Sequence, residues 1–147
     1  MASRWILITL AVVAFLAVSF ELARYLSAPN AERSAIYALV QDAARGDVAA
    51  VTARLERCAG ACATQVAATV ERVRRPGEVK LLQLDGGEGS LTGTRTSRAR
   101  VAWAADIAHG GRAVVQCVTV RRRWSFVSGA SITLLRLSVP IPPETAC

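Results

Sequence analysis

The feature that most constrains this chain is an uncharged apolar run close to its first residue. Residues Trp5 to Phe20 carry no charge, and the apolar character continues to Ala23 with Glu21 as the one exception. Nineteen helical residues at about 1.5 Å per residue extend over about 28 Å, close to the hydrocarbon thickness of a bilayer. Trp5 and Tyr25 bracket the run, as aromatic residues do at the two membrane–water interfaces. The run therefore predicts a single-pass membrane helix, with residues 1–26 as the anchor.

A cleaved signal peptide is the alternative interpretation of the same run. Ala17 and Ser19 provide the small residues that signal peptidase needs, but only if the apolar core ends early. Cleavage after Ala28 is disfavoured, because the next residue is Pro29. We favour the uncleaved anchor.

The cysteines indicate on which side of the membrane the rest of the chain lies. Positive charges do not decide this, because Arg4 precedes the run while Arg24 and Arg33 follow it. The chain contains four cysteines, Cys58, Cys62, Cys117 and Cys147. An even number of cysteines in a modest domain suits an oxidising compartment. We therefore expect the C-terminal domain to be extracytoplasmic.

We expect the disulfide bonds Cys58–Cys62 and Cys117–Cys147. The first pair flanks Ala59-Gly60-Ala61, a predicted break between two helices, so the Cα atoms can approach the roughly 5.5–6 Å that a disulfide needs. The tail after Pro143 can fold back until Cys147 reaches Cys117. Four cysteines allow three connectivities, so a bond from the helical pair to the sheet, such as Cys62–Cys117, is the alternative.

The predicted domain, residues 31–147, begins after a linker at residues 27–30. Asn30 suits the N-cap of a helix whose apolar stripe is Ile36, Leu39, Val40 and Ala43. Gly46 suits the left-handed residue after that helix, and Asp47 suits the N-cap of the next one. A second helix continues through Val48, Val51, Leu55 and Cys58. A third runs from about Cys62 to Arg74, with Val66, Val70 and Val73 inward, and ends at Pro76-Gly77.

After Pro76 the apolar period changes from helical to alternating, which indicates strands. We predict strands at Val79–Asp85, around Val101–Ile107, at Ala113–Arg123 and at Ile132–Val139. Loops at Gly86–Ser90, His109–Gly111 and Ser128-Gly129 separate them. Helices followed by a meander predict an α+β domain, with two or three helices packed on a roughly four-stranded antiparallel sheet.

No catalytic constellation, metal set or phosphate loop stands out in the sequence, and we expect no cofactor. His109 is the one histidine and lies in a predicted turn, so no partner completes a catalytic or zinc site. Cys58 and Cys62 would offer two zinc ligands only if the orientation were reversed. Gly86–Ser90 lacks the Gly-Lys-Ser/Thr ending of a P-loop. Asp85 and Asp106 are the carboxylates on which a small pocket enzyme would depend.

Arginines form the most distinctive charged feature. All of the 18 basic residues except Lys80 are arginines, and the formal net charge is +7. Arg98 and Arg100 share one face of their strand, and Arg121 and Arg123 share one face of the next, so the four can form an anion-binding patch. The alternative, which we favour, is a sheet edge kept soluble by charge.

Ala43-Ala44-Arg45-Gly46-Asp47, a helix–Gly-Asp–helix junction, precedes antiparallel strands with Arg123-Trp124 near the end. This order resembles the nuclear-transport-factor-2-like (NTF2-like) cone fold from Ala35 onward. The Cys58/Cys62 pair and the Val115–Val118 strand are similar to singly membrane-anchored actinobacterial proteins. The cone fold implies a curved sheet and helices around a pocket, which enzymes and non-catalytic members both use. Three helices before the first strand depart from it.

Together these features predict a membrane-tethered, non-catalytic binding or interaction module of the bacterial cell envelope. One alternative is a small pocket enzyme of the same fold that uses a buried carboxylate. Another is an arginine-based adaptor for anionic lipid or wall polymer. The expected partners are the membrane and an envelope protein or anionic polymer. Nucleic acid is not expected, because the domain is predicted to lie outside the cytoplasm.

Overall fold

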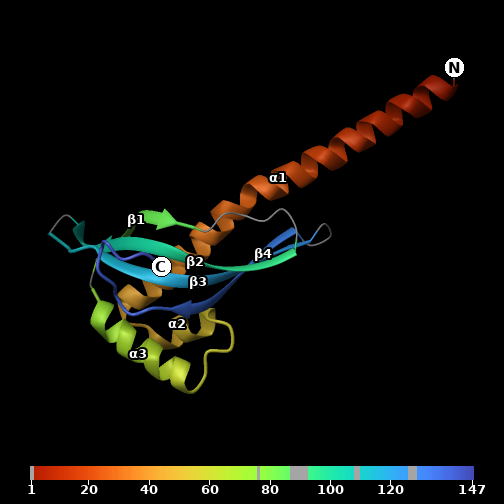
Figure 1. The fold of residues 1–147 in the computed structure, drawn as a ribbon. Helices are drawn as coiled ribbons and strands as arrows, with labels where there is room; N and C mark the ends of the chain where they lie inside the picture. Colours follow the sequence, from red (N-terminus) through yellow and green to blue (C-terminus); the bar gives the residue numbers. More distant parts are fainter. Residues whose placement is uncertain (1, 76, 87–92, 108–109, 126–128) are drawn as a thin grey trace.

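The computed structural model describes residues 2–75, 77–86, 93–107, 110–125 and 129–147, and within the first helix the side chains of residues 4–23 and 30–45. Three helices come first: α1 (Ala2–Arg45), α2 (Val48–Arg54) and α3 (Ala61–Val73). Four strands follow: β1 (Val79–Asp85), β2 (Gly93–Ala105), β3 (Val114–Ser125) and β4 (Gly129–Leu137). This order confirms the predicted α+β class (Figure 1).

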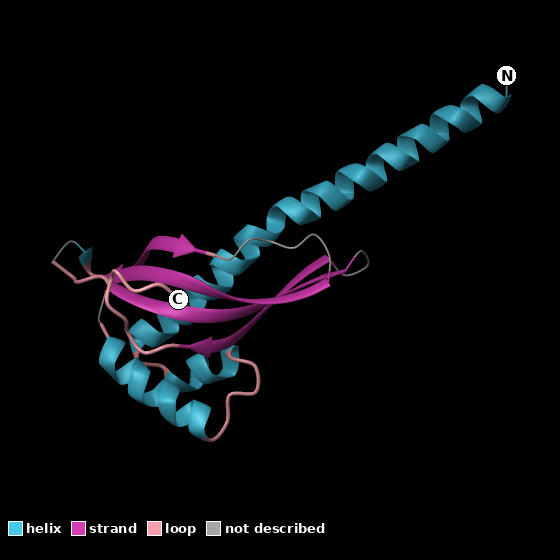
Figure 2. Cartoon of the chain, in the orientation of Figure 1, coloured by secondary structure: helices cyan, strands magenta, loops and turns pink. Residues whose placement is uncertain are grey.

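The sheet is a meander in which each strand pairs antiparallel with the next, in the order β1-β2-β3-β4. The C-terminal part of α1 crosses one face of this sheet, while the segment after β4 returns over the opposite face (Figure 2). We call the first the inner face and the second the outer face. Paired residues of antiparallel strands point to the same side, so the register assigns every strand side chain to one face.

The first half of α1 projects away from the domain, and the second half packs on the inner face (Figure 1). Arg4–Ala23 is the one described segment long and apolar enough to cross a membrane, with a mean hydropathy of 2.5 and no buried residue. The predicted apolar stripe, Ile36, Leu39, Val40 and Ala43, is fully buried. The two halves of α1 therefore lie in different environments: the first is apolar and exposed, and the second is packed on the sheet.

The predicted break between these two halves is wrong. Residues 27–30 are helical, and Asn30 lies inside α1 rather than at an N-cap. Pro29 costs the helix one backbone N–H donor. Long helical stretches on both sides and residues of high helix propensity such as Ala31 and Glu32 outweigh that cost. The Tyr25 side chain, predicted at a membrane interface, lies outside the described residues, whereas Trp5 is described and exposed.

The hydrophobic core lies between the inner face and the helices. Trp103 of β2 is fully buried there, together with Val101 from its own strand and Val118 and Val120 from β3. The predicted inward residues of α3, Val66, Val70 and Val73, are buried in the same core. The Trp103 indole donates to Gln116 Oε1 at 3.0 Å, and Gln116 Nε2 donates to the Ser138 carbonyl at 2.9 Å, so this buried amide is satisfied.

The junction between α1 and α2 has the predicted chemistry. Gly46 has φ of 83°, a left-handed conformation that glycine adopts without strain. Asp47 caps α2, because its carboxylate accepts a hydrogen bond from the Ala50 N–H at 2.9 Å. Helix α2 ends earlier than predicted, at Arg54. Leu55 leaves the helix in an extended conformation and forms a parallel bridge with Leu134, which places Leu55 beside the edge strand β4.

Two strands differ from the sequence-based assignments, and one of them is β4, which spans Gly129–Leu137 instead of Ile132–Val139. Strand β2 ends at Ala105 and excludes Ile107, because Asp106 adopts a positive φ of 54° that interrupts the extended backbone. β2 is not half-buried at this end, since Ala102 and Ala104 on the outer face are buried as well. The predicted turn residues His109 and Ser128 lie outside the described residues, as do residues 87–90 of the predicted glycine-rich loop.

Candidate functional site

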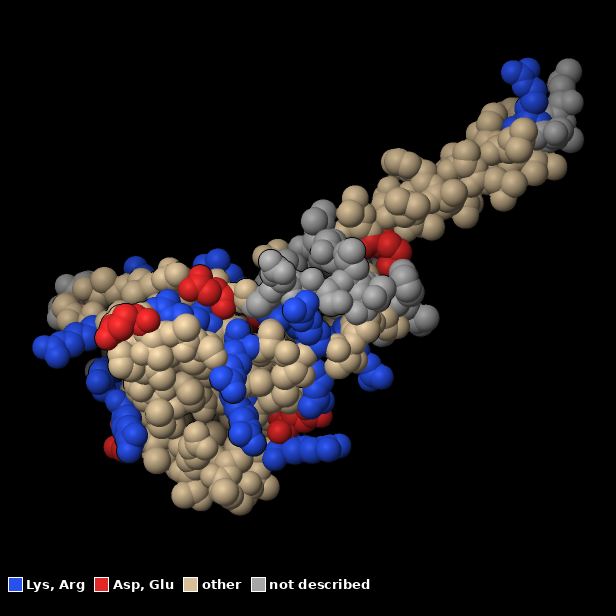
Figure 3. Space-filling view, viewed as in Figure 1, with Lys and Arg blue, Asp and Glu red and all other residues tan. Residues whose placement is uncertain are grey.

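The four predicted arginines share the outer face of the sheet. In the register Arg98 pairs with Thr119, Arg100 with Cys117, Thr96 with Arg121 and Thr94 with Arg123. Since β2 and β3 are the two central strands, the expectation that these arginines keep a sheet edge soluble is wrong. Figure 3 shows basic side chains across this face, with fewer acidic ones beside them.

Two of the arginines hold the C-terminal tail, residues 138–147, against the sheet. The tail first runs beside β3, with the Ser138 N–H donating to the Cys117 carbonyl and the Ile141 N–H to the Val115 carbonyl. Arg98 Nη1 then donates to the main-chain oxygen of Cys147 at 3.0 Å, and Arg100 donates to the Pro143 carbonyl. These guanidinium groups therefore have a structural task as well as a charge.

The other two arginines differ in their partners. Arg121 Nη1 lies 2.8 Å from Glu56 Oε2, in a pair whose side chains are both partly exposed. Arg123 is exposed and has no ion-pair partner among the described residues. The predicted patch therefore exists as a shared face, but Arg98 and Arg100 are engaged by the tail, and Arg100 and Arg121 also pair with carboxylates.

Both predicted disulfide bonds are present in the structure. Cys58 bonds to Cys62 with a Cα–Cα distance of 5.1 Å, and Cys117 bonds to Cys147 with a Cα–Cα distance of 5.8 Å. The first bond fixes the chain between α2 and α3. The second fastens the end of the tail to β3.

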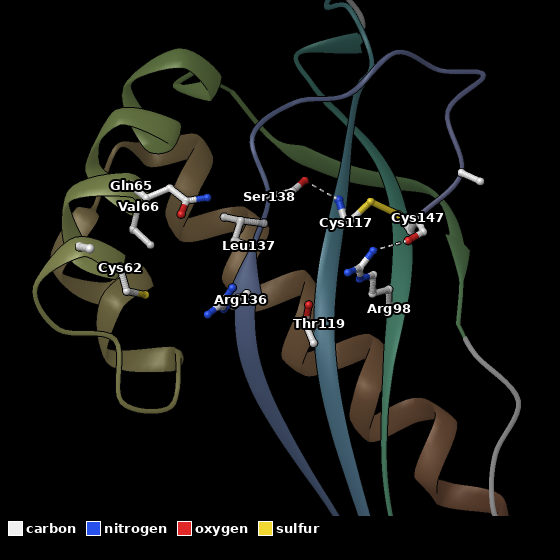
Figure 4. Close-up of a pocket in the computed structure, with 12 residues that line it drawn as sticks. Cys62, Gln65, Val66, Arg98, Cys117, Thr119, Arg136, Leu137, Ser138 and Cys147 are labelled. Atoms are coloured by element: carbon white, nitrogen blue, oxygen red, sulfur yellow. Dashed lines mark hydrogen bonds between the residues drawn. A yellow bond between two sulfur atoms is a disulfide. The ribbon is translucent and has the colours of Figure 1, made fainter.

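A groove of about 420 Å³ opens between α3, the β4 edge of the sheet and the tail. We call it the tail groove (Figure 4). Its lining comprises Ala61, Cys62, Gln65 and Val66 of α3, Arg98, Cys117, Thr119, Arg136 and Leu137 of the sheet, and Ser138, Ala146 and Cys147 of the tail. None of these lining residues is acidic.

Arg98, Thr119 and Arg136 form one row across three adjacent strands of the tail groove. Arg98 pairs with Thr119, and Thr119 pairs with Arg136. Figure 4 shows Arg136 extending from β4 toward α3, while Arg98 points to the tail. Arg136 has no ion-pair partner among the described residues. Two guanidinium groups that flank a hydroxyl provide the donors that a carboxylate or phosphate group needs.

The floor and the side wall of the tail groove are less polar. Val66 and Leu137 are buried residues that contribute apolar surface, and Gln65 is an exposed amide on α3. The Ser138 hydroxyl accepts from the Cys117 N–H at 2.8 Å and donates to the Val139 carbonyl at 2.7 Å. It is therefore occupied by the backbone rather than activated by a base.

The carboxylates on which an enzyme would depend lie elsewhere. Asp85 is exposed at the end of β1, 3.5 Å from Arg100 Nη1, and Asp106 lies in the turn after β2. Neither lines the tail groove. Asp42 is buried but pairs with Arg45 and Arg54, a structural link between α1 and α2. Within the described residues no three His, Cys, Asp or Glu side chains gather as a metal site.

Two functional arrangements were missed by the sequence reasoning. Arg136 was not singled out, because only the strand register reveals that it lies in one row with Arg98. The second is the ion pair between Glu32 of α1 and Arg122 of β3, where Arg122 Nε donates to Glu32 Oε2 at 2.6 Å and Nη1 donates to the Ser97 hydroxyl. A usable signal did exist, since Arg122 points opposite to Arg121 and Arg123 and a charge on an inner face needs a partner.

No protein-family model, curated protein or solved structure matches this chain.

Proposed function

We propose that this chain is a membrane-tethered binding module of the bacterial cell envelope, with its domain outside the cytoplasm and its ligand site in the tail groove. The observation that carries the proposal is the continuity of α1. The same helix contains the exposed apolar segment Arg4–Ala23 and the buried stripe from Ile36 to Ala43. A domain built on its own spanning helix cannot move far from the membrane that holds it.

The extracytoplasmic location is supported by the cysteines. All four are paired in the two disulfide bonds, and none is free. Such bonds persist in oxidising compartments and are rare in the cytosol. The anchor interpretation in turn requires the apolar segment to stay attached to the mature protein rather than to be removed as a signal peptide.

The tail groove suits an anionic ligand with an apolar portion. Arg98 and Arg136 provide positive charge, Thr119 provides a hydroxyl, and Val66 and Leu137 provide an apolar floor. Because no Asp or Glu side chain is among the described lining residues, these groups fit binding of an anion better than acid–base chemistry on it. The NTF2-like resemblance and the pocket enzyme stay predictions, and the described lining of the tail groove gives the enzyme no Asp or Glu side chain.

The location is tested with reporters fused after Cys147 in the bacterial host. A phosphatase that is active only outside the cytoplasm should work there, and the mature protein should keep residues 1–28 and stay with membranes after a high-salt wash. An inactive phosphatase, with a cytoplasmic reporter active at the same position, would overturn the location. A soluble protein beginning near Phe20 would overturn the anchor.

The ligand site is tested with inorganic phosphate and citrate as probes of the full chain in detergent. Binding to the native state raises the midpoint of thermal unfolding by mass action. We expect both probes to raise the midpoint of the parent protein and to raise that of Arg136→Gln much less. Arg112→Gln is the matched control, because Arg112 is exposed and does not line the tail groove. Equal responses of the two variants would refute the site.

A further inference from the structure

The end of the sheet that faces the projecting part of α1 has its own charge pattern. Strand β2 begins at Gly93, β3 ends at Ser125 and β4 begins at Gly129, and all three positions pair in one region of the sheet. This end points to the side on which α1 leaves the domain (Figures 1 and 2). We call it the helix-side end of the sheet.

The contact between Glu32 and Arg122 fixes the height of this end along α1. Glu32 lies nine positions after Ala23, the last residue of the apolar segment, which corresponds to about 14 Å of helix. A headgroup layer is about 5–8 Å thick, so about 6–9 Å separates its outer surface from the level of Glu32 when α1 stands upright. From Arg122 to Ser125 the strand can advance by about 10 Å. An advance of that size along the axis of α1 would bring Ser125 to the headgroups, with Arg123 two rows and Arg95 three rows behind it.

Three acidic side chains that the structure describes on the sheet and beside it form ion pairs. Glu32 pairs with Arg122, Glu56 with Arg121, and Asp85 with Arg100. Three further arginines, Arg33 of α1, Arg95 of β2 and Arg123 of β3, are exposed and have no ion-pair partner among the described residues. The described charge left over at this end is therefore positive.

The surroundings of these arginines also suit a polar surface. Thr94 pairs with Arg123, and Arg123 pairs with Ser131, so hydroxyl groups flank it on both neighbouring strands. Trp124 follows in the next row, one row before the Ser125–Gly129 pair, and is half-buried. Tryptophan accumulates at both membrane–water interfaces, and the arginine guanidinium group matches the geometry of a lipid phosphate.

We propose that the helix-side end of the sheet docks on the membrane surface, where Arg33, Arg95 and Arg123 bind the phosphate groups of anionic lipids in the adjacent leaflet. This inference rests on the proposed membrane anchor. The anchor keeps the arginines at a high effective concentration near lipid, so three modest contacts suffice to hold one orientation. Docking of this end leaves the tail groove, with its Arg136, directed away from the lipid and open to a second ligand.

The proposal predicts a specific footprint on the full chain reconstituted into vesicles. An arginine-selective dicarbonyl reagent with mass-spectrometric readout reports the accessibility of each guanidinium group. In phosphatidylcholine vesicles containing phosphatidylglycerol, Arg33, Arg95 and Arg123 should react several-fold more slowly than in pure phosphatidylcholine. Arg75, whose N–H donates to the Ala44 carbonyl, and Arg112, two residues before the start of β3, lie away from this end and should react equally in both. High salt should remove the protection, because it screens exposed charges.

Free anions provide the first control of this footprint. Inorganic phosphate added to pure phosphatidylcholine vesicles should leave the three arginines reactive. Equal protection by inorganic phosphate would overturn lipid docking in favour of a soluble anion. Equal reactivity of the three arginines in both kinds of vesicle would also overturn it. A chain that fails to sediment with either kind of vesicle would instead refute the anchor and thus the proposed function.

Variants provide the second control. The triple variant Arg33→Gln, Arg95→Gln, Arg123→Gln should lose the preference for phosphatidylglycerol over phosphatidylcholine among lipids that stay bound in native mass spectrometry. The matched triple variant Arg72→Gln, Arg75→Gln, Arg112→Gln removes the same charge from exposed positions and should keep the preference. Loss of the preference in both variants would show that net charge alone attracts the lipid, and would overturn docking by this surface.

Discussion

The two halves of α1 have the same backbone structure and opposite relations to their surroundings. From Arg4 to Ala23 the helix is predominantly apolar around its circumference, and no residue of this segment is buried. From Ile36 to Ala44 it buries a single stripe against the inner face of the sheet and exposes the rest. A helix that is apolar all round suits lipid, whereas a striped one suits a protein core. The side-chain pattern, rather than any break in the helix, marks where one environment ends and the next begins.

The continuity of α1 also explains the position of the Glu32–Arg122 pair. Glu32 is the first buried residue of the embedded half, and its partner lies 90 residues further along the chain. The pair therefore fixes the point at which the projecting helix leaves the sheet. Its loss would loosen the connection that relates the membrane to the domain.

The largest expected effect comes from comparing a leucine-to-alanine substitution in each half of α1. Leu39 is fully buried, and Leu10 is 61% exposed. Leu39→Ala should lower the free energy of unfolding by about 2–5 kcal/mol, because it removes buried methyl groups and leaves a cavity. Leu10→Ala should leave it almost unchanged. Denaturant unfolding of the full chain in detergent, followed by tryptophan fluorescence, measures both. Similar losses from the two variants would mean that the projecting half packs on the domain.

The second expected effect contrasts the two disulfide bonds of the domain. Replacing Cys117 and Cys147 by serine opens a loop of 30 residues and should cost about 3–4 kcal/mol by the chain-entropy estimate. Replacing Cys58 and Cys62 opens a separation of only four residues and should cost about 2 kcal/mol. The unfolding midpoints of the two double variants measure the two losses of stability. Membrane association should be unchanged in both variants. A larger loss for the short loop would contradict the entropic argument.

The part of α1 that packs on the sheet, and its junction with α2, could be predicted well from the sequence because local patterns determine them. The stripe from Ile36 to Ala43, the left-handed Gly46 and the Asp47 cap each follow from residue type and spacing alone. Strand β1 was predicted with its observed limits, Val79–Asp85, because turn residues and proline bound it.

The tail groove could not be predicted in the same way, because it depends on register and on long-range contacts. Arg98, Thr119 and Arg136 come together only when β2, β3 and β4 are aligned. A shift by one residue would send each side chain to the other face. The linker was mispredicted for the opposite reason. Pro29 and Asn30 are strong local signals, and the helix on both sides overrides them.

The third expected effect contrasts two ion pairs at different depths. Side chains of the Glu32–Arg122 pair are 10% and 16% exposed, and those of the Glu56–Arg121 pair are 31% and 39% exposed. Breaking a fully buried pair costs about 3–5 kcal/mol, so Glu32→Gln should cost somewhat less, roughly 2–3 kcal/mol. Glu56→Gln should cost less than about 1 kcal/mol. Double-mutant cycles with Arg122→Gln and Arg121→Gln isolate the two coupling energies. Equal coupling energies for the two pairs would contradict the role of the Glu32–Arg122 pair in fixing α1 on the sheet.

The smallest expected effect tests the continuity of α1 itself. Asp47→Ala should cost about 1 kcal/mol, because Asp47 caps the first turn of α2 and the Ala50 N–H loses its acceptor. Asn30→Ala should cost nothing or stabilise slightly, because alanine has the higher helix propensity inside a continuous helix. The sign of the second change is decisive, since a helix that began at residue 31 would lose a cap and become less stable. Thermal unfolding of both variants in the same detergent distinguishes these cases. If Asn30→Ala lost as much stability as Asp47→Ala, Asn30 would be a helix cap and α1 would consist of two helices. The distance from the membrane to Arg33, Arg95 and Arg123 would then no longer be fixed.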